Sequence, residues 1–209
     1  MTSTVLEGAD DGPGRWGDGR AGERDGDEFA QMIGAFRLLQ ERITGSVPPR
    51  STLVEMARVF GEFAATLEPF TVPERQQVTG HRTDLPGRGQ ALVPAFHADL
   101  STDHEVRGRF TFSRYYLGGN GAAHGGTIPL IFDEVLGRLA NAGGRPLSRT
   151  AYLNVDFRSI TPIGVELRLE ARFDREEGRK RFLSARIHHG DVLTAEAEGL
   201  FVALRPGQP

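Results

Sequence analysis

The sequence contains no cysteine among its 209 residues, so disulfides, thiolate metal sites, thiol redox pairs and a cysteine nucleophile are all excluded. It also lacks any run close to the roughly 18 apolar residues that a membrane-spanning helix needs. No basic region followed by an apolar run marks a signal peptide near residue 1. From these absences we expect a cytoplasmic protein with no membrane segment.

Strong charge of one sign is lacking as well, since the formal net charge at pH 7 is only −3. Without a basic field, nucleic acid and anionic membrane surfaces are not expected partners, whereas small molecules and other proteins are. The 38% content of hydrophobic residues is enough for one core of roughly 100 to 150 residues plus extensions. We therefore predict one folded domain with additional segments.

The first part of the chain divides into three predicted segments. Residues 1–28 hold seven glycines and eight acidic residues with almost nothing apolar, a composition typical of a disordered tail. Residues 29–68 carry apolar side chains at helical spacing, interrupted by a proline pair, which predicts a two-helix extension. The second helix is expected to start with a capping box formed by Thr52 and Glu55. Residues 69–91 are rich in proline, glycine and charge and are interpreted as a connecting loop.

Residues 92–205 follow a different pattern, in which apolar and polar side chains alternate and one long stretch is apolar nearly all round. Alternation is typical of strands with one buried face, and a helix that is apolar all round must be covered by other elements. The pattern predicts an α+β fold in which an antiparallel sheet wraps round one long central helix, with the last three strands forming a meander. The predicted strands are 92–100, 106–116, 151–158, 164–174, 181–188 and 193–203, and the helix is 125–141.

The segment GGNGAAHGGTIPLIFDEVLG at 118–137 joins a predicted strand to the central helix. It lacks the lysine of a phosphate-binding P-loop and the third glycine of a dinucleotide fingerprint, which disfavours nucleotide binding of either type. Gly125 and Gly126 fall in the first turn of the helix, where backbone N–H groups without helical partners carry the positive end of the helix dipole. These amides could receive an oxyanion. A tight strand-to-helix turn without a ligand is the plainer interpretation of the same glycines.

Two carboxylates lie on the apolar helix, and each has a structural and a functional interpretation. A carboxylate there is costly unless it is exposed, paired or used in chemistry, and Asp133 shares a helix face with Gly126 and Gly137, where a ligand could approach. Glu134 lies about 100° further round the helix and four residues before Arg138, which suits an ordinary ion pair. Asp133 is therefore the first candidate for a reactive carboxylate, and Glu134 is the second.

Helix geometry separates the glycine turn from Asp133. Gly125 and Asp133 are eight residues apart, or about 12 Å at 1.5 Å per residue, so both cannot touch one carbonyl group. A two-fold dimer that sets two such helices side by side would bring Gly125 of one chain toward Asp133 of the other. If the chain is an enzyme, the sequence thus predicts a homodimer with two shared sites, and such dimers could pair into a homotetramer.

Histidine offers little metal chemistry in this sequence. His188 and His189 are adjacent near a turn, but no third ligand stands at a useful spacing. We therefore predict neither a metal site nor a cofactor.

The residues quoted above resemble the hotdog-fold thioesterases of the phenylacetate-pathway type, within the 4-hydroxybenzoyl-CoA thioesterase-like superfamily. The likeness covers about residues 85–204. It rests on three motifs: His124-Gly125-Gly126, Asp133-Glu134-Val135-Leu136-Gly137, and Thr150 at the start of a strand that continues Leu153-Asn154-Val155-Asp156-Phe157-Arg158. The resemblance implies a hotdog fold for this part of the chain, an acyl-CoA thioesterase activity and no cofactor.

The resemblance also implies catalytic roles for individual residues. The Gly125 amide, assisted by Gly126, would polarise the thioester carbonyl. Asp133 from the other subunit would act as nucleophile or as general base on water. Thr150 would position Asp133 or the attacking water, and His124 would shape the loop and contact the thioester.

Substrate contacts are implied for Gly126, Asn120, Glu134 and Arg158. Arg158 could meet a phosphate of CoA, although an arginine beside a strand is as often a solvated charge. Asn120 offers a polar contact, but the asparagine of the family commonly lies farther upstream. The helical extension departs from the minimal hotdog unit, and it could pack on the outside of the sheet or cap the acyl pocket and set chain length.

Two other functions fit the same fold. One is a non-catalytic module that binds acyl-CoA, and the other is an enoyl-CoA hydratase or dehydratase. Asp133 favours an enzyme, because a pure binder has no need for that carboxylate. His124 abuts the helix start, as it does in the thioesterases, which favours hydrolysis over proton transfer at carbon.

Overall fold

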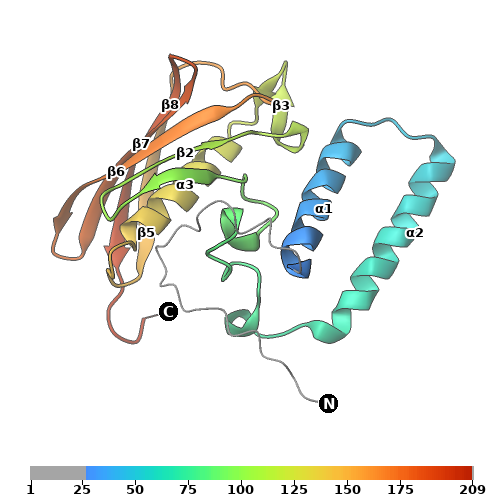
Figure 1. Cartoon of the computed structure of the whole chain (residues 1–209), viewed down its shortest axis with the longest axis horizontal. Coiled ribbons are helices and arrows are strands. Elements are labelled where there is room, and N and C mark those ends of the chain that lie inside the picture. The colour runs from blue at the N-terminus through green and yellow to red at the C-terminus, as the bar shows by residue number, and fades with distance from the viewer. Residues whose placement is uncertain (1–26, 209) are drawn as a thin grey trace.

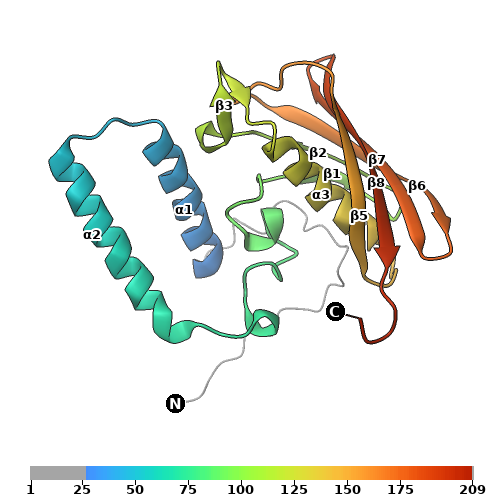
Figure 2. The same cartoon turned by 180° about the vertical axis from the view of Figure 1, so that it is seen from behind.

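The structure is a computed structural model that describes residues 27–208, so all but two residues of the predicted acidic tail at 1–28 lie outside the described residues. A pair of helices stands beside a curled sheet that holds one further helix (Figure 1, Figure 2). The α-helices are α1 (Glu28–Thr44), α2 (Arg50–Leu67) and α3 (Thr127–Ala140). The strands are β1 (His97–Ser101), β2 (Glu105–Phe110), β3 (Leu117–Gly119), β4 (Ala122–Ala123), β5 (Ser148–Phe157), β6 (Leu167–Glu177), β7 (Lys180–His189) and β8 (Val192–Ala203). The short 3-10 helices are η2 (Glu68–Phe70), η3 (Glu74–Gln76), η4 (Pro86–Gly89) and η5 (Arg114–Tyr116).

The main sheet has six strands in the order β1-β2-β6-β7-β8-β5, and every neighbouring pair is antiparallel. Strands β6, β7 and β8 form the predicted meander, and β5 is added beside β8 at one edge. A separate hairpin of β3 and β4 leads into α3, which lies along the inner side of the curled sheet (Figure 2). The predicted α+β architecture of a sheet wrapped round one helix is confirmed.

The hydrophobic core lies between α3 and the inner face of the sheet. Alternate side chains of β6 and β7 are buried, as the period of two predicts, and they meet the apolar side of α3. Burial of a side chain such as Phe132 or Leu136, both fully buried, contributes about 1.5–3 kcal/mol. Nine of the 14 residues of α3 are buried, which explains why its sequence is apolar nearly all round. Neither α3 nor another helix within residues 27–208 is long and apolar enough to cross a membrane.

Four predicted strands have an end that is wrong by three residues or more, including β5, which starts at Ser148 and not at residue 151, and two of these errors have a clear local reason. The strand predicted at 106–116 ends at Phe110, because the Ser113 side chain caps η5 by accepting a hydrogen bond from the amide two residues on (3.3 Å). The strand predicted to start at Gly164 starts three residues later, since Gly164 has φ +71°, a turn conformation that glycine adopts without strain. The strand predicted at 92–100 begins only at its sixth residue.

The predicted capping box at the start of the second helix is also wrong. Helix α2 begins at Arg50, directly after Pro49, and no side chain caps it. Proline has a fixed φ that suits the position just before a helix, so the helix starts two residues before Thr52. Glu55 pairs with Arg58 at 2.6 Å instead of reaching back to Thr52.

The helices α1 and α2, with the turn between them, form a helical arm (residues 28–67) that rests on the connecting loop. Arg37 of α1 donates from Nη2 to three loop carbonyls between residues 86 and 93, at 2.7 to 3.2 Å. Near the end of α1, Glu41 accepts a hydrogen bond from the Arg114 amide of η5 at 2.6 Å. The arm therefore stands beside the sheet (Figure 1, Figure 2). It does not pack on the outside of the sheet, which was one of the two roles expected for it.

Arg181 on β7 is only 1% exposed, on a strand face where the sequence predicts apolar residues alone. Its Nη1 donates to the Ala140 carbonyl at 2.8 Å and to the Pro146 carbonyl at 2.7 Å, and its Nε donates to Glu176 at 3.1 Å. Ala140 is the last residue of α3, where carbonyls have no partner inside the helix. Arg181 therefore ties the end of α3 to the sheet.

Candidate active site

The His124-Gly125-Gly126 turn precedes α3, so the helix predicted to begin at Gly125 begins two residues later, at Thr127. The His124 carbonyl accepts hydrogen bonds from the Thr127 amide at 2.9 Å and from the Thr127 hydroxyl at 2.7 Å. The His124 ring turns back on the same segment, and its Nδ1 accepts a hydrogen bond from the Gly126 amide at 3.0 Å. Because Nδ1 is an acceptor, the neutral ring carries its proton on Nε2. His124 thus holds the turn closed.

The two glycine amides of the turn are not equivalent. The Gly126 N–H donates to His124, so it is not available to a carbonyl in this conformation, and the expected assistance from Gly126 gains no structural support. The Gly125 N–H has no hydrogen-bond partner within residues 27–208. A Cβ placed on Gly125 would meet no atom within 4 Å. An unpartnered amide beside open space at the start of a helix is suited to bind an oxyanion.

Asp133 lies in the second turn of α3 and is exposed, whereas Phe132 and Glu134 on either side of it are buried. Its Oδ1 accepts a hydrogen bond from the Thr150 hydroxyl at 2.8 Å. Thr150 lies on β5 at a β-bulge, where the register against β8 shifts between Thr150 and Tyr152. A bulge of this kind re-aims a side chain relative to a regular strand. The structure therefore brings together two residues for which the resemblance implies catalytic roles.

Glu134 is held by two guanidinium groups, and its side chain is only 4% exposed. Arg88 of η4 donates to it from Nη2 at 2.8 Å and from Nε at 3.2 Å. The expected ion pair with Arg138 is present at 3.9 Å, with the Arg138 side chain 5% exposed. Burial lowers the pKa of Arg138 to about 10, a shift that the nearby Glu134 carboxylate opposes. The carboxylate of Glu134 is thus fully engaged within the protein.

Asn120 and Arg158 lie apart from the Asp133 side chain. Asn120 is exposed at the tip of the β3–β4 hairpin, in a left-handed conformation with φ +49°. Arg158 follows β5, and its guanidinium donates to Glu196 at 2.8 Å and to Asp156 at 3.0 Å. No hydrogen bond in the described part of the chain joins either residue to Asp133. Their substrate contacts stay predictions.

The β3–β4 hairpin contributes a glycine that sequence reasoning missed. A Cβ on Gly118 would lie 2.8 Å from the Cα of His124, so only glycine lets β3 approach the turn this closely. The His124 amide donates to the Tyr116 carbonyl at 2.7 Å, which fixes the turn against the hairpin. The sequence signal that could have indicated this close approach is the Gly118-Gly119 pair, which precedes the His124 turn.

An antiparallel sheet curled round one central helix defines the hotdog fold. Residues 120–196, which include the glycine turn, α3 and Thr150, match the sequence model of the Thioesterase superfamily. This match and the antiparallel sheet curled round α3 confirm the predicted resemblance to hotdog-fold thioesterases.

Curated relatives match part of this chain. The acyl-coenzyme A thioesterase THEM4 of Bos taurus is 36% identical over 94 residues, which are 44% of this chain and 38% of that protein. The acyl-coenzyme A thioesterase THEM5 of Mus musculus is 28% identical over 123 residues, which are 58% of this chain and 48% of that protein. The chain therefore spans less than half the length of these two relatives.

A solved structure resembles a larger part of the chain. The crystal structure of protein RHA08564, a thioesterase superfamily protein, has a TM-score of 0.73 and 25% sequence identity, and the match covers 85% of this chain and 96% of that one. Residues 92–205 are little more than half of the 209 residues. The structural likeness therefore extends beyond the sheet and α3 into the segments that precede them.

Proposed function

We propose that this chain hydrolyses an acyl-CoA thioester to a free acid and CoA. The observation that carries the proposal is the contact between Asp133 and Thr150, in which a hydroxyl holds an exposed carboxylate at 2.8 Å on a mostly buried helix. Within residues 27–208 Asp133 forms no ion pair, so its negative charge is available for chemistry. The two relatives named acyl-coenzyme A thioesterases support the substrate class.

The proposed site is shared between two copies of the chain. Along the chain, Gly125 and Asp133 are separated by about 12 Å of helical rise, too far for one carbonyl group. Strand β5, which carries Thr150, pairs only with β8 among the described strands, so its other edge offers backbone groups for pairing. Two β5 edges meeting across a two-fold axis would turn Asp133 of each copy toward the glycine turn of the other. Pairs of such dimers could assemble into a homotetramer.

The chemistry divides between the two half-sites. The Gly125 amide would donate to the thioester oxygen and stabilise the charge that develops as the carbonyl carbon becomes tetrahedral. The Asp133 carboxylate would either attack that carbon, giving an acyl-aspartyl anhydride that water then hydrolyses, or take a proton from the attacking water. On both routes the C–S bond breaks, one water is consumed, and CoA leaves as its thiol.

The remaining parts of the proposal concern CoA and the compartment. Arg158 follows the same edge strand and is half exposed, so its guanidinium could exchange a carboxylate partner for a CoA phosphate. Asn120, at the hairpin tip, would add a polar contact. A chain without cysteine has no disulfide that a reducing compartment could break, which agrees with the predicted location in the cytoplasm.

Release of free CoA thiol from a panel of acyl-CoAs tests the proposed activity. The panel covers short, medium and long acyl chains and an aryl group, and we expect hydrolysis of at least one class. A thiol reagent reports only the product, because the protein has no cysteine of its own. A folded protein that binds acyl-CoA but releases no thiol from any class would instead be the non-catalytic module.

Thr150→Val is expected to lower kcat roughly 10- to 100-fold with little change in KM, since a hydrogen bond to a charged group contributes about 1.5–3 kcal/mol. Valine keeps the branched shape on β5 but removes the hydroxyl that holds Asp133. Thr150→Ser restores a hydroxyl and should recover most of kcat. Equal impairment of the valine and serine variants would mean that Thr150 acts through packing and not by positioning Asp133.

A further inference from the structure

The two helices of the arm carry apolar stripes whose residues alternate at spacings of three and four. The α1 stripe consists of Met32, Phe36, Leu39 and Ile43. The α2 stripe consists of Leu53, Met56, Phe60, Phe63 and Leu67. Such spacing keeps side chains along one side of a helix and is typical of helices that pack side by side.

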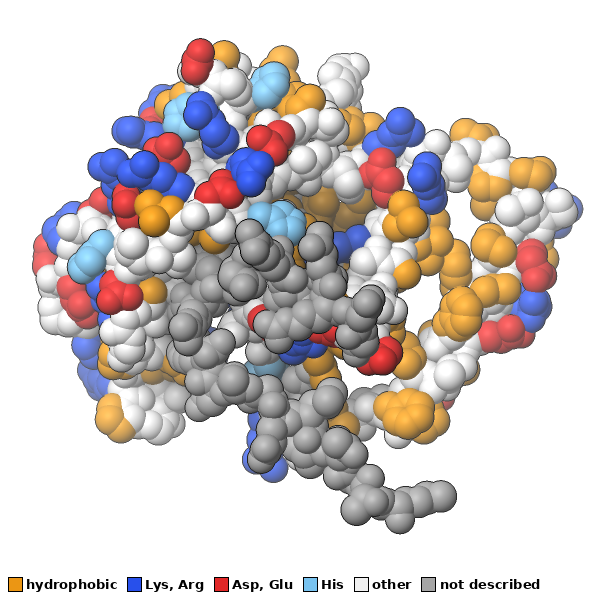
Figure 3. Space-filling view, in the orientation of Figure 1, with side chains coloured by type: hydrophobic (Ala, Val, Ile, Leu, Met, Phe, Trp, Pro, Cys, Tyr) orange, Lys and Arg blue, Asp and Glu red, His pale blue; other side chains and the backbone are white. Residues whose placement is uncertain are grey.

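These stripes lack a partner in the described chain. Neither α1 nor α2 has a buried residue, and seven of the nine stripe residues are between 37% and 64% exposed. Figure 3 shows hydrophobic side chains gathered along both helices around the opening between them. Most of the stability of a helix in a protein comes from the packing of its apolar face, so α2, which has no buried residue, needs a packing partner.

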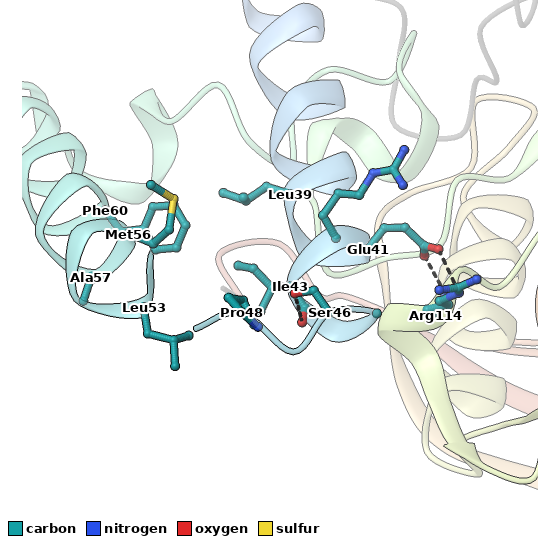
Figure 4. A pocket seen from close by; sticks show the side chains of 12 residues that line it. Leu39, Glu41, Ile43, Ser46, Pro48, Leu53, Met56, Ala57, Phe60 and Arg114 are labelled. Atoms are coloured by element: carbon teal, nitrogen blue, oxygen red, sulfur yellow. Dashed lines mark hydrogen bonds and ion pairs between the residues drawn. The ribbon is translucent and has the colours of Figure 1, made fainter. Parts of the chain in front are cut away.

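The space between the helices is an open cavity of about 670 Å³. Leu39 of α1 and Met56 and Phe60 of α2 point toward one another across it (Figure 4). Among residues 27–208, the charged side chains that line the cavity are Glu41, Arg42 and Arg114, at its α1 side, and Glu41 already pairs with Arg114. The cavity is therefore an apolar groove, and the two arm helices do not close it by packing on each other.

The α2 stripe is wider than α1 alone can cover. Ala57 lies beside the α2 stripe on one side of the helix and Val59 lies beside it on the other. Small or apolar residues therefore extend beyond the stripe in both directions. A narrow seam suits a pair of helices, whereas a wide stripe is typical of a helix in the core of a bundle. The charged side chains on the polar side of α2 pair with one another, because Arg58 forms ion pairs with both Glu55 and Glu62.

We propose that the helical arm packs against the arm of a second copy of this chain, so that two α1 and two α2 helices form a four-helix bundle. A two-fold axis would set the same stripes of both copies against each other, as a self-complementary interface requires. Neither the α2 stripe nor the residues that flank it carry a charge, so nothing on this surface selects an acidic or a basic partner.

The size of the exposed stripes agrees with such an interface. Large apolar side chains present on the order of 150–200 Å² each, so the seven exposed stripe residues leave on the order of 600 Å² open to a partner. A stable interface buries about 600–1,000 Å² from each partner. Helix α2 is also the element farthest from the sheet (Figure 1, Figure 2), so this interface is separate from the β5 edge and does not rest on the proposed activity.

Single cysteines test the arm interface, because these 209 residues contain no cysteine and any disulfide must join two copies. Cysteine replaces Leu53, Met56, Phe60 or Phe63, one at a time, and the control Ala65→Cys lies on the opposite side of α2. Under mild oxidation we expect about tenfold more covalent dimer from at least one stripe variant than from the control, since a disulfide needs Cβ atoms about 4 Å apart. Circular dichroism confirms that each variant keeps its helix content.

Two outcomes would overturn the proposal. One is that no stripe cysteine forms more covalent dimer than Ala65→Cys in folded protein, as expected if an acyl chain or another protein fills the groove. The other comes from a chain with cysteines at both Leu39 and Phe60: links within single chains alone would show that α1 and α2 close on each other. Loss of hydrolysis in Asp133 variants with intact cross-linking would leave the arm interface standing, because the two proposals fail independently.

Discussion

Asp133→Asn is expected to lower kcat for acyl-CoA hydrolysis by about 10²- to 10⁴-fold, the usual contribution of a general acid or base. Asparagine has nearly the same shape and can still accept the hydrogen bond of the Thr150 hydroxyl, which is 2.8 Å long in the wild type. It lacks the charge that attacks the carbonyl or takes a proton from water. The measurement is thiol release with the best wild-type substrate, with the free energy of unfolding determined in parallel.

Asp174→Asn is the matched control for this variant. Asp174 on β6 is also exposed and also accepts a hydrogen bond from a hydroxyl on a neighbouring strand, Ser184, at 3.0 Å. Its loss should change kcat by no more than about twofold, as expected for a surface substitution away from the site. Wild-type kcat in Asp133→Asn would contradict the mechanism, and equal losses in both variants would indicate a general effect of surface charge.

Mixed dimers extend the same prediction to the shared site. Gly125→Pro removes the N–H that would bind the oxyanion, so neither it nor Asp133→Asn alone should hydrolyse substrate. In a mixed dimer, one site combines the intact Gly125 of one chain with the intact Asp133 of the other. Because about half of the dimers are mixed and each has one working site of two, about a quarter of wild-type activity should return. No recovery from two folded variants would place both groups in one subunit.

Glu134→Gln is expected to reduce the free energy of unfolding by about 3–5 kcal/mol, because it removes a buried carboxylate that pairs with Arg88 and with the buried Arg138. Glu134 and Arg138 are 4% and 5% exposed, and the pKa of Arg138 is already lowered to about 10 by burial. Removing the Glu134 carboxylate makes the charged form of Arg138 still less favourable, because that carboxylate raises the pKa of Arg138. Urea denaturation of wild type and variant gives the difference directly.

Two companion variants show whether buried charge is the cause. Glu62→Gln removes a partner of Arg58 whose side chain is 62% exposed, and it should cost less than about 1 kcal/mol. Replacing both Glu134 and Arg138 with methionine should recover at least about half of the loss, since an apolar pair needs no compensation. A double variant as unstable as Glu134→Gln would assign the loss to packing. A raised KM in folded Glu134→Gln would instead support the predicted substrate contact.

The sequence predicts those parts of the fold that depend on local periodicity. The alternation in β6, β7 and β8 and the apolar run of α3 identify the elements and the meander correctly, because each buried face leaves its period in the sequence. Element ends are less accurate where a short-range contact decides them. Ser113 and Gly164 stop or delay a strand through a side-chain cap and a positive φ, and neither effect changes the hydrophobic pattern.

For the candidate site, the sequence predicts the contact between Asp133 and Thr150 only through the family resemblance, since 17 residues separate them. Of the two arginines that pair with Glu134, Arg138 was predicted, but Arg88 could not be, because it lies 46 residues away in a loop without periodicity. The sequence also could not predict that the Gly126 N–H donates a hydrogen bond while the Gly125 N–H does not, because this difference depends on which way the His124 ring turns.

The burial of Arg181 has a consequence for the order in which this chain can fold. Helix α3 is complete well before β7 along the chain, yet its final carbonyl receives a hydrogen bond from a residue 41 positions later. Until β7 is in place, that end of α3 must stay in contact with water, because an unpaired buried carbonyl is costly. We therefore expect docking of the helix and growth of the meander to form one cooperative event, because the contact that completes the end of α3 is not local.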